Sequence, residues 1–356
     1  MNETSLSELL PSLRIVLLGY GHVARAFMPL LASRHEWIGR ELGLRPVIVG
    51  LGSRSIGLYT HTDGINAHEL AQEVESLNRF RQAGIRANTV EQFIEAGKAA
   101  GATLFIELTT LNPLDGQPAL AHIRTALELG MDVITANKGP VAFAQVELQS
   151  LARRQQVQFR FESCVMDGLP LLNLAEFTLP AVEMSGFRAL LNSTSSLVLG
   201  MIEQGYAREE ALLKAQQMGI SEVDPSFDLD GWDAVMKTTI LANTLLEGNL
   251  TPRMVEREGI RHLTSDDICS AALAGSPYRL VSEAHRAQGV IRAVVTPQRI
   301  QTDDILHAAI NLGGIISLET EAMGILSIVE HSNNVTQTAY GVLSDLVNIE
   351  RNRRAG

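Results

Sequence analysis

The sequence predicts an α/β protein of two domains, the first of them built on a parallel sheet. Three observations support this prediction. A short apolar run ends at a glycine-rich turn near residue 19 and continues into a helical pattern. Strand and helix patterns then alternate, with glycines at the joints, and the pattern changes after residue 150. Strands alternating with helices are typical of parallel sheets, and 356 residues are enough for two domains.

The predicted elements of the first half alternate in type. Residues 13–18 (LRIVLL) and 102–108 (ATLFIEL) are apolar runs, as expected of strands buried on both faces. The order is a strand at 13–18, a helix to about residue 33, a strand at 46–51, mostly helix over 66–100, a strand at 102–108, a helix at 120–129 closed by Gly130, and a strand at 131–136.

The second half mixes strands and helices without this regular alternation. Its order is a strand at 157–162, a helix after Pro170, a strand at 185–192, helices over 194–247, an antiparallel layer over 288–330, and a helix near 335–350. Alternation of apolar and polar residues around glycines is typical of antiparallel strands. We therefore predict a second sheet in this half.

Composition and charge argue against several classes of protein. The net charge of −11 is offset by no basic stretch, which argues against a nucleic-acid partner. Acidic Glu3 and Glu8 do not predict a signal peptide, and no apolar run approaches the ~20 residues of a membrane span. Cys164 and Cys269 show no metal-ligand spacing and suit a reducing compartment. We expect a cytoplasmic protein with neither nucleic-acid nor membrane partner.

The turn after the first strand has the form of a dinucleotide-binding motif. Gly19 and Gly21 stand in the sequence GYGHVA, between a strand and a helix, and Ala24 takes the position of the third glycine. The backbone from Gly19 to Ala24, through His22 and Val23, would place the cofactor's pyrophosphate at the helix N-terminus. The motif predicts a Rossmann-type domain, although a plain strand-to-helix turn has a similar sequence.

The end of the second strand indicates which dinucleotide binds. This position commonly carries a carboxylate for the adenosine ribose, whereas here Ser53, Arg54 and Ser55 follow the strand. A guanidinium between two hydroxyls suits a 2′-phosphate. We therefore predict NADP rather than NAD, with an exposed loop arginine as the alternative.

Polar residues follow two further strands. Thr109 and Thr110 come after the strand at 102–108, and Lys138 ends the sequence TANK (135–138), which follows the strand residues 131–134. Ligands of open α/β sheets bind outside the carboxyl ends of the strands. We therefore expect these residues at the nicotinamide end of the cofactor.

Residues 222–237 (EVDPSFDLDGWDAVMK) bring five carboxylates to one lysine, Lys237. A helix starting near residue 230 would place Asp230, Asp233 and Lys237 within roughly 60° of one another. Such a pair on a helix is commonly a surface ion pair. Here the approach is unusual, because Glu222, Asp224 and Asp228 lead into the helix and concentrate negative charge beside one lysine.

These motifs resemble those of one enzyme family. The segment 219–237 is similar to the most diagnostic segment of homoserine dehydrogenases, and residues 135–138 (TANK), 162–170 (ESCVMDGLP) and 192–196 (NSTSS) stand in the family's order at about its spacing. The resemblance covers most of residues 13–350 and is to the short form, which lacks a C-terminal regulatory module.

The resemblance implies an NAD(P)-dependent interconversion of L-homoserine and L-aspartate-4-semialdehyde, in amino-acid biosynthesis. It implies a Rossmann-type domain over residues 1–143, completed by residues 331–356, and an α/β catalytic and dimerisation domain over residues 144–330. The expected assembly is a homodimer.

The resemblance also implies roles for single residues. Lys237 is expected to be the acid/base and Asp233 its companion. Glu222, Asp228 and Lys138 are expected to bind the amino-acid substrate, with Lys138 also beside the cofactor. A monovalent cation such as sodium is implied near four residues, which are Glu162, Val165, Asp167 and Leu169.

This chain departs from the family pattern in a loop near the cofactor. Residues 329–339 (VEHSNNVTQTA) replace a loop that is rich in glycine and alanine in the family. An oxidoreductase acting on another amino-acid-derived alcohol is therefore an alternative, and a non-catalytic dinucleotide-binding regulator is a second. An aldehyde dehydrogenase using Cys164 is less well supported, because no histidine base can be identified for it.

Overall fold

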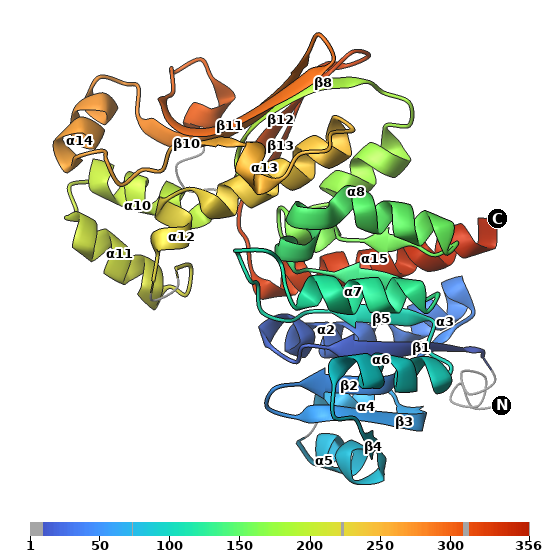
Figure 1. Cartoon of the computed structure of the whole chain (residues 1–356). Helices are drawn as coiled ribbons and strands as arrows, with labels where there is room; N and C mark the ends of the chain where they lie inside the picture. The colour runs from blue at the N-terminus through green and yellow to red at the C-terminus, as the bar shows by residue number, and fades with distance from the viewer. Residues whose placement is uncertain (1–9, 73, 222–223, 309–312, 356) are drawn as a thin grey trace. The chain divides into compact units, whose positions relative to one another are not determined.

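Two sheets organise the chain (Figure 1). The computed structural model describes all residues except 1–9, 73, 222–223, 309–312 and 356. It divides into two compact units, one of Met1–Pro170 with Asn334–Gly356 and one of Leu171–Asn333.

The first unit contains a seven-stranded sheet in the order β4-β3-β2-β1-β5-β6-β7. The pairs β2–β1, β1–β5, β5–β6 and β6–β7 are parallel. The strands are β1 (Ser12–Leu18), β2 (Arg45–Ser53), β3 (Gly57–Ile65), β4 (Ile85–Arg86), β5 (Leu104–Glu107), β6 (Asp132–Thr135) and β7 (Phe159–Arg160).

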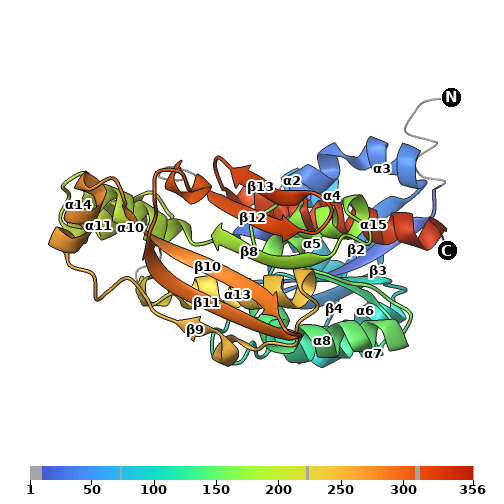
Figure 2. The ribbon, with the colours of Figure 1, turned by 90° about the horizontal axis from the view of Figure 1, so that it is seen from above.

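Helices cover both faces of this sheet, as a parallel sheet requires (Figure 2). One layer consists of α2 (His22–Ser33), α3 (His35–Leu42), α4 (Ala67–Gln72) and α15 (Val335–Ala355). The other consists of α6 (Val90–Ala99), α7 (Ala119–Glu128) and α8 (Lys138–Arg154), while α5 (Val74–Ala83) packs on β3. The short 3₁₀ turn η1 (Glu162–Cys164) follows β7.

The C-terminal helix α15 completes the core of the first unit. Its buried apolar residues Ala339, Val342, Leu346 and Ile349 recur at intervals of three and four residues, so they form one stripe. This stripe packs with α2 in the same cluster that contains the buried strand β1. Residues distant in the sequence therefore share one hydrophobic core.

The edge of the first sheet differs from a fully parallel arrangement. The strand β3 runs antiparallel to β2. Only three residues separate Ser53 from Gly57, and so short a connection permits an antiparallel hairpin but no parallel crossover. This strand was not predicted from the sequence.

The first boundary between the units falls at residue 170, later than the expected residue 143. Residue 143 lies inside α8, which packs on α7. The strand expected at 157–162 is shorter, at Phe159–Arg160, and pairs with β6 of the first sheet. The strand that was expected to open the second half of the chain therefore belongs to the first sheet.

The second unit contains a six-stranded mixed sheet in the order β13-β12-β8-β10-β11-β9. Its strands are β8 (Met184–Leu190), β9 (Glu256–Arg257), β10 (Tyr278–Ala287), β11 (Val290–Arg299), β12 (Gly314–Thr320) and β13 (Gly324–Glu330). Its helices are α9 (Leu171–Asn173), a π-turn η2 (Leu174–Thr178), α10 (Ser193–Glu203), α11 (Arg208–Gln217), α12 (Ser226–Leu229), α13 (Trp232–Leu245) and α14 (Ser265–Leu273), with 3₁₀ turns η3 (Pro252–Met254) and η4 (Ile305–Ala308).

The helices α10 and α13 pack on the central strands β10 and β11 of this sheet. A buried ion pair between Arg279 of β10 and Glu203 at the end of α10, with N–O distance 2.6 Å, fastens that helix to the sheet. None of the helices in the described part of the chain is both long and apolar enough to cross a membrane.

Candidate active site

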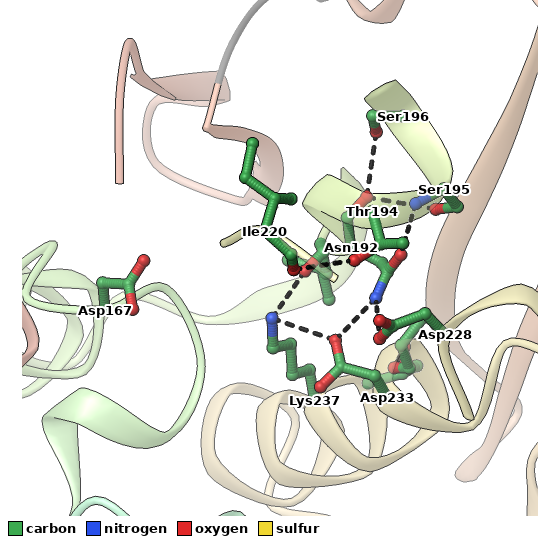
Figure 3. A network of polar contacts seen from close by, with 12 residues as sticks. Asp167, Asn192, Thr194, Ser195, Ser196, Ile220, Asp228, Asp233 and Lys237 are labelled. Carbon is green, nitrogen blue, oxygen red and sulfur yellow. Dashed lines mark hydrogen bonds and ion pairs between the residues drawn. The ribbon is translucent and has the colours of Figure 1, made fainter. Parts of the chain in front are cut away.

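The side chain of Lys237 lies in a polar network beside the N-terminal half of α13 (Figure 3). Its Nζ atom lies 3.1 Å from Oδ2 of Asp233, one helical turn earlier, and donates a hydrogen bond of 2.7 Å to the carbonyl oxygen of Leu191. The ammonium group has no third partner among the residues that the structure describes. One of its three protons therefore remains for a ligand.

Asn192 connects the two carboxylates of the network. Its Nδ2 atom donates to Oδ1 of Asp228 at 2.8 Å and to Oδ2 of Asp233 at 3.0 Å (Figure 3). Its Oδ1 atom accepts the backbone N–H of Ser195 at 2.7 Å and so caps α10. All hydrogen-bonding atoms of this amide are used, which fixes its orientation.

The surroundings of Asp228 disfavour its ionised form. Burial raises the pKa of this carboxyl group, and the negative charge of Asp233 raises it further. Hydrogen bonds from Asn192 and Thr194 and the charge of Lys237 act in the opposite direction. A positively charged group bound beside Asp228 would therefore stabilise the carboxylate.

The turn between α12 and α13 determines which acidic residues of the stretch 222–237 lie near Lys237. Gly231 has φ 82°, a left-handed conformation that glycine adopts readily, and α13 starts only at Trp232. Asp230 therefore precedes the helix and pairs with Arg261 at 2.8 Å rather than joining Lys237. Asp224 is exposed and bonds to Ser226. Glu222 lies outside the described residues.

The dinucleotide motif forms the predicted strand-to-helix turn in the first unit. Gly19 has φ 97°, and a Cβ atom there would lie 2.3 Å from the carbonyl oxygen of Leu108. Gly21 is the N-cap of α2 without a side-chain cap, and a Cβ atom there would meet nothing within 4 Å. Ala24 is fully buried, as expected of the close-packing position. The turn therefore has the open backbone that a pyrophosphate requires.

The other residues of this motif lie around the open turn. His22 is exposed and Val23 is partly buried at the start of α2. At the end of β2, Ser53 and Ser55 lie with their hydroxyl oxygens 3.2 Å apart. Arg54 is exposed and points to Thr110, whose Oγ1 lies 3.4 Å from the guanidinium. The structure thus brings the predicted adenosine-side residues to the carboxyl edge of the sheet.

The ends of β5 and β6 are joined by hydrogen bonds. The backbone N–H of Thr109 donates to Oε1 of Glu107 at 2.8 Å, and Thr135 Oγ1 donates to Oε2 at 2.9 Å. Asn137 caps α8 through a bond of 3.2 Å from the N–H of Gly139, so that the partly buried Lys138 starts the helix. Both loops carry residues that the sequence assigns to the cofactor.

Cys164 is unsuited to the role of a nucleophile. Burial raises its pKa well above the ordinary value, and its Sγ atom donates to the carbonyl oxygen of Thr135 at 3.4 Å. A reactive cysteine requires a stabilised thiolate. The geometry therefore argues against the aldehyde dehydrogenase alternative.

The loop expected to hold a cation packs against α15. Thr338 Oγ1 donates to Oδ1 of Asp167 at 2.9 Å, and the Ser163 hydroxyl donates to the carbonyl oxygen of Thr338 at 2.7 Å. The N–H of Glu162 donates to Asp345 at 2.9 Å. Val165 and Glu162 are buried, whereas Leu169 is partly exposed. The backbone N–H of Leu169 donates to the carbonyl oxygen of Met166.

Several polar groups of these networks had no role predicted from the sequence, among them the side chains of Glu107, Thr135, Asn137 and Asn192 and the carbonyl oxygen of Leu191. Glu107 carried a usable signal, because it is the only charged residue in the apolar run 102–108. Asn192 precedes a run of Ser and Thr, which indicates only a helix cap.

Comparison with known proteins identifies similar chains over nearly the full length. Residues 170–347 match the family model for homoserine dehydrogenase. The NAD(+)-dependent homoserine dehydrogenase of Pseudomonas canavaninivorans is 36% identical over 340 residues, which cover 95% of this chain and 96% of that protein.

Two solved structures resemble the fold. The homoserine dehydrogenase of Thiobacillus denitrificans matches with TM-score 0.81 and 24% identity, covering 98% of this chain and 75% of that one. A hyperthermophilic archaeal homoserine dehydrogenase mutant in complex with NADPH matches with TM-score 0.79 and 24% identity, covering 96% and 98%. These matches confirm the predicted α/β fold class.

Proposed function

Because the chain belongs to the homoserine dehydrogenase family, we propose that it catalyses the NAD(P)-dependent interconversion of L-homoserine and L-aspartate-4-semialdehyde. The observation that carries this proposal is the network of Lys237, Asp233, Asn192 and Asp228. It combines a fixed ammonium group with carboxylates for an amino-acid substrate, which is what this reaction requires.

Lys237 is the proposed acid and base. In the reductive direction its free proton is delivered to the aldehyde oxygen, directly or through water, as negative charge develops there. In the oxidative direction the lysine receives the hydroxyl proton of homoserine. Asp233 and the carbonyl oxygen of Leu191 hold the side-chain nitrogen of Lys237 in place.

The carboxylates are proposed to bind the α-ammonium group of the substrate. Asp228 lies beside the lysine network with a carboxyl group that a cation would stabilise. Glu222 and Lys138 are proposed to complete substrate binding, the latter opposite the substrate carboxylate or beside the cofactor. These roles come from the motif positions.

The nicotinamide dinucleotide supplies or accepts the hydride when it is bound. The open turn from Gly19 to Ala24 would hold its pyrophosphate, and Thr109, Thr110 and Lys138 would border its other half. Ser53 and Arg54 favour NADP through a 2′-phosphate contact. A relative of 36% identity is described as NAD(+)-dependent, so the preference has to be measured.

A monovalent cation is proposed at residues 162–169. The donors would be the Glu162 carboxylate and the carbonyl oxygens of Val165, Asp167 and Leu169, and hard oxygen donors of this kind suit sodium. Thermal unfolding in sodium and in tetramethylammonium buffers would test the site. An unchanged Tm would argue against it.

A homodimer and a cytoplasmic location are also proposed. The second sheet carries a hollow whose lining includes Arg188, Ser317 and Ser327, with exposed Ile305 and Ile325 beside it. Ile325 lies on β13 and Ile305 in η4, and exposed apolar side chains of this kind are suited to contact a second copy. Sedimentation analysis would test the dimer, and a monomer at all concentrations would reject it.

The decisive experiment is homoserine oxidation by the purified protein with NAD and with NADP, followed by the absorbance of the reduced cofactor. Turnover with either supports the proposal. If homoserine gives no reduced cofactor but another amino-acid-derived alcohol does, the substrate assignment is wrong. The altered loop 329–339 is then the first candidate for the change in substrate specificity.

A further inference from the structure

The carboxyl group of Glu107 is completely buried at the end of β5. The groups that donate hydrogen bonds to it are neutral, and burial raises its pKa. Burying an ionisable group in this way costs stability that an apolar residue would not cost. Such a residue therefore calls for a purpose other than stability.

Glu107 joins two loops that leave the same edge of the sheet. Its Oε1 atom accepts both the backbone N–H and the hydroxyl of Thr109, and its Oε2 atom accepts the hydroxyl of Thr135. The hydroxyl oxygen of Thr135 in turn accepts the N–H of Asn137 at 3.0 Å. This second bond forces the Thr135 proton toward Glu107, so the direction of the network is fixed.

A further bond closes the network. Asn137 Nδ2 donates to the carbonyl oxygen of Thr109 at 3.2 Å, while Asn137 Oδ1 accepts the N–H of Gly139 at the start of α8. Asn137 therefore joins the loop after β5 to the start of α8. Lys138, the first residue of α8, stands between Asn137 and Gly139.

The order of the strands places this network relative to the dinucleotide. The turn with Gly19 and Gly21 follows β1, and the adenosine-side residues Ser53 and Arg54 follow β2 on one side of it. The strands β5 and β6 lie on the other side of β1. The network therefore lies on the nicotinamide side of the turn, and the residue after Thr109, Thr110, is the one that Arg54 reaches, at 3.4 Å.

We infer that Glu107 is a positioning residue for the nicotinamide half of the cofactor, acting through Thr109 and the start of α8. The inference rests on the proposed dinucleotide function. It predicts a selective effect, because loosening the network disturbs one half of the cofactor site and leaves the other in place.

The test compares two ligands in the same variant by calorimetric titration. Glu107→Gln keeps the shape but presents an N–H donor where a donor already points, so the Kd for the whole cofactor is expected to rise by about tenfold. The Kd for ADP-ribose, or for its 2′-phosphate if NADP is preferred, is expected to stay at the wild-type value. Thr135→Val, which removes one bond of the network, is expected to give the same selective loss.

The matched control is Asp132→Asn. Asp132 is also buried, and it stands at the opposite end of the neighbouring strand, where it accepts the N–H of Gln158 and pairs with Arg353. The Asp132→Asn variant is expected to have a lower Tm and an unchanged ratio of the Kd for the whole cofactor to the Kd for ADP-ribose. The inference is overturned if Glu107→Gln and Thr135→Val keep the wild-type ratio, with or without a lower Tm. Homoserine turnover by the wild type tests the proposed function separately.

Discussion

The ammonium group of Lys237 and the carboxylate of Asp233 lie 3.1 Å apart on successive turns of α13, with both side chains largely shielded from water. An exposed pair at this spacing contributes little to stability. Here the lysine is held on a second side by the carbonyl oxygen of Leu191 at 2.7 Å. The geometry restricts the ammonium group to one direction of proton donation.

Lys237→Met is expected to lower kcat by about 10²–10⁴-fold, because the variant keeps the length of the side chain and loses the proton donor. Cofactor Kd should change little, since no residue assigned to the dinucleotide is changed. Steady-state rates and titration of the cofactor measure both quantities. Lys214→Met, on α11, is the matched control, and equal rates for the two variants would contradict the assignment.

Asn192→Ala is expected to lower kcat/KM for homoserine by about ten- to a hundredfold, because two charge-assisted hydrogen bonds are lost. Ser196→Ala removes a bond to the backbone oxygen of the same residue and leaves its amide in place, so it serves as control. The role of the amide would be rejected if both variants had the wild-type kcat/KM.

The parts of this protein that sequence could predict are those set by local patterns. The strand before Gly19 and the pair of Asp233 and Lys237 follow from residues close in the chain. The role of Asn192 does not, because its two carboxylate partners lie 36 and 41 residues away. The exclusion of Asp230 depends on where α13 begins, and the ends of elements are weakly encoded by pattern alone.

Homoserine binding is expected to weaken as the pH falls, and to do so at a higher pH than an ordinary aspartate would cause. Burial and Asp233 raise the pKa of Asp228 above its usual 3.8, so its negative charge is lost earlier on acidification. The effect on folding has the opposite sign. A carboxyl group whose pKa is raised in the folded state favours folding at low pH, and this contribution to stability is lost as the pH rises through the raised pKa.

The pH dependence of KM for homoserine measures this effect. Asp228→Asn should raise KM at neutral pH and abolish the part of the acid-side rise that Asp228 causes. Its acid limb should therefore differ from that of the wild type. If both proteins show the same acid limb, another group, such as Asp233, controls substrate binding.

Arg54→Ala is expected to reduce the preference for NADP over NAD by about tenfold or more, because a charge-assisted contact to the 2′-phosphate is lost. The ratio of kcat/KM for the two cofactors measures it. The exposed Arg40→Ala is a control on the same unit, since its guanidinium pairs only with Glu41 at 2.9 Å in the described structure. An unchanged ratio in Arg54→Ala would show that Arg54 does not select NADP.

Gly168→Ala is expected to destabilise the first unit by about 1–3 kcal/mol, the usual range for overpacking a close contact. A Cβ atom at Gly168 would lie 1.9 Å from the carbonyl oxygen of Gln337 in α15, and backbone cannot move aside as a side chain can. Gly39→Ala is the control, because its nearest neighbour is the end of the flexible Leu10 side chain at 3.2 Å and alanine favours the helix. Chemical denaturation compares the stability of the two variants.

Since Asp167 precedes Gly168 and bonds to Thr338 of the same helix, the Gly168→Ala variant should also weaken any stabilisation by sodium, whereas the Gly39→Ala control should keep it. Equal stability of the two variants would mean that α15 does not clamp this loop.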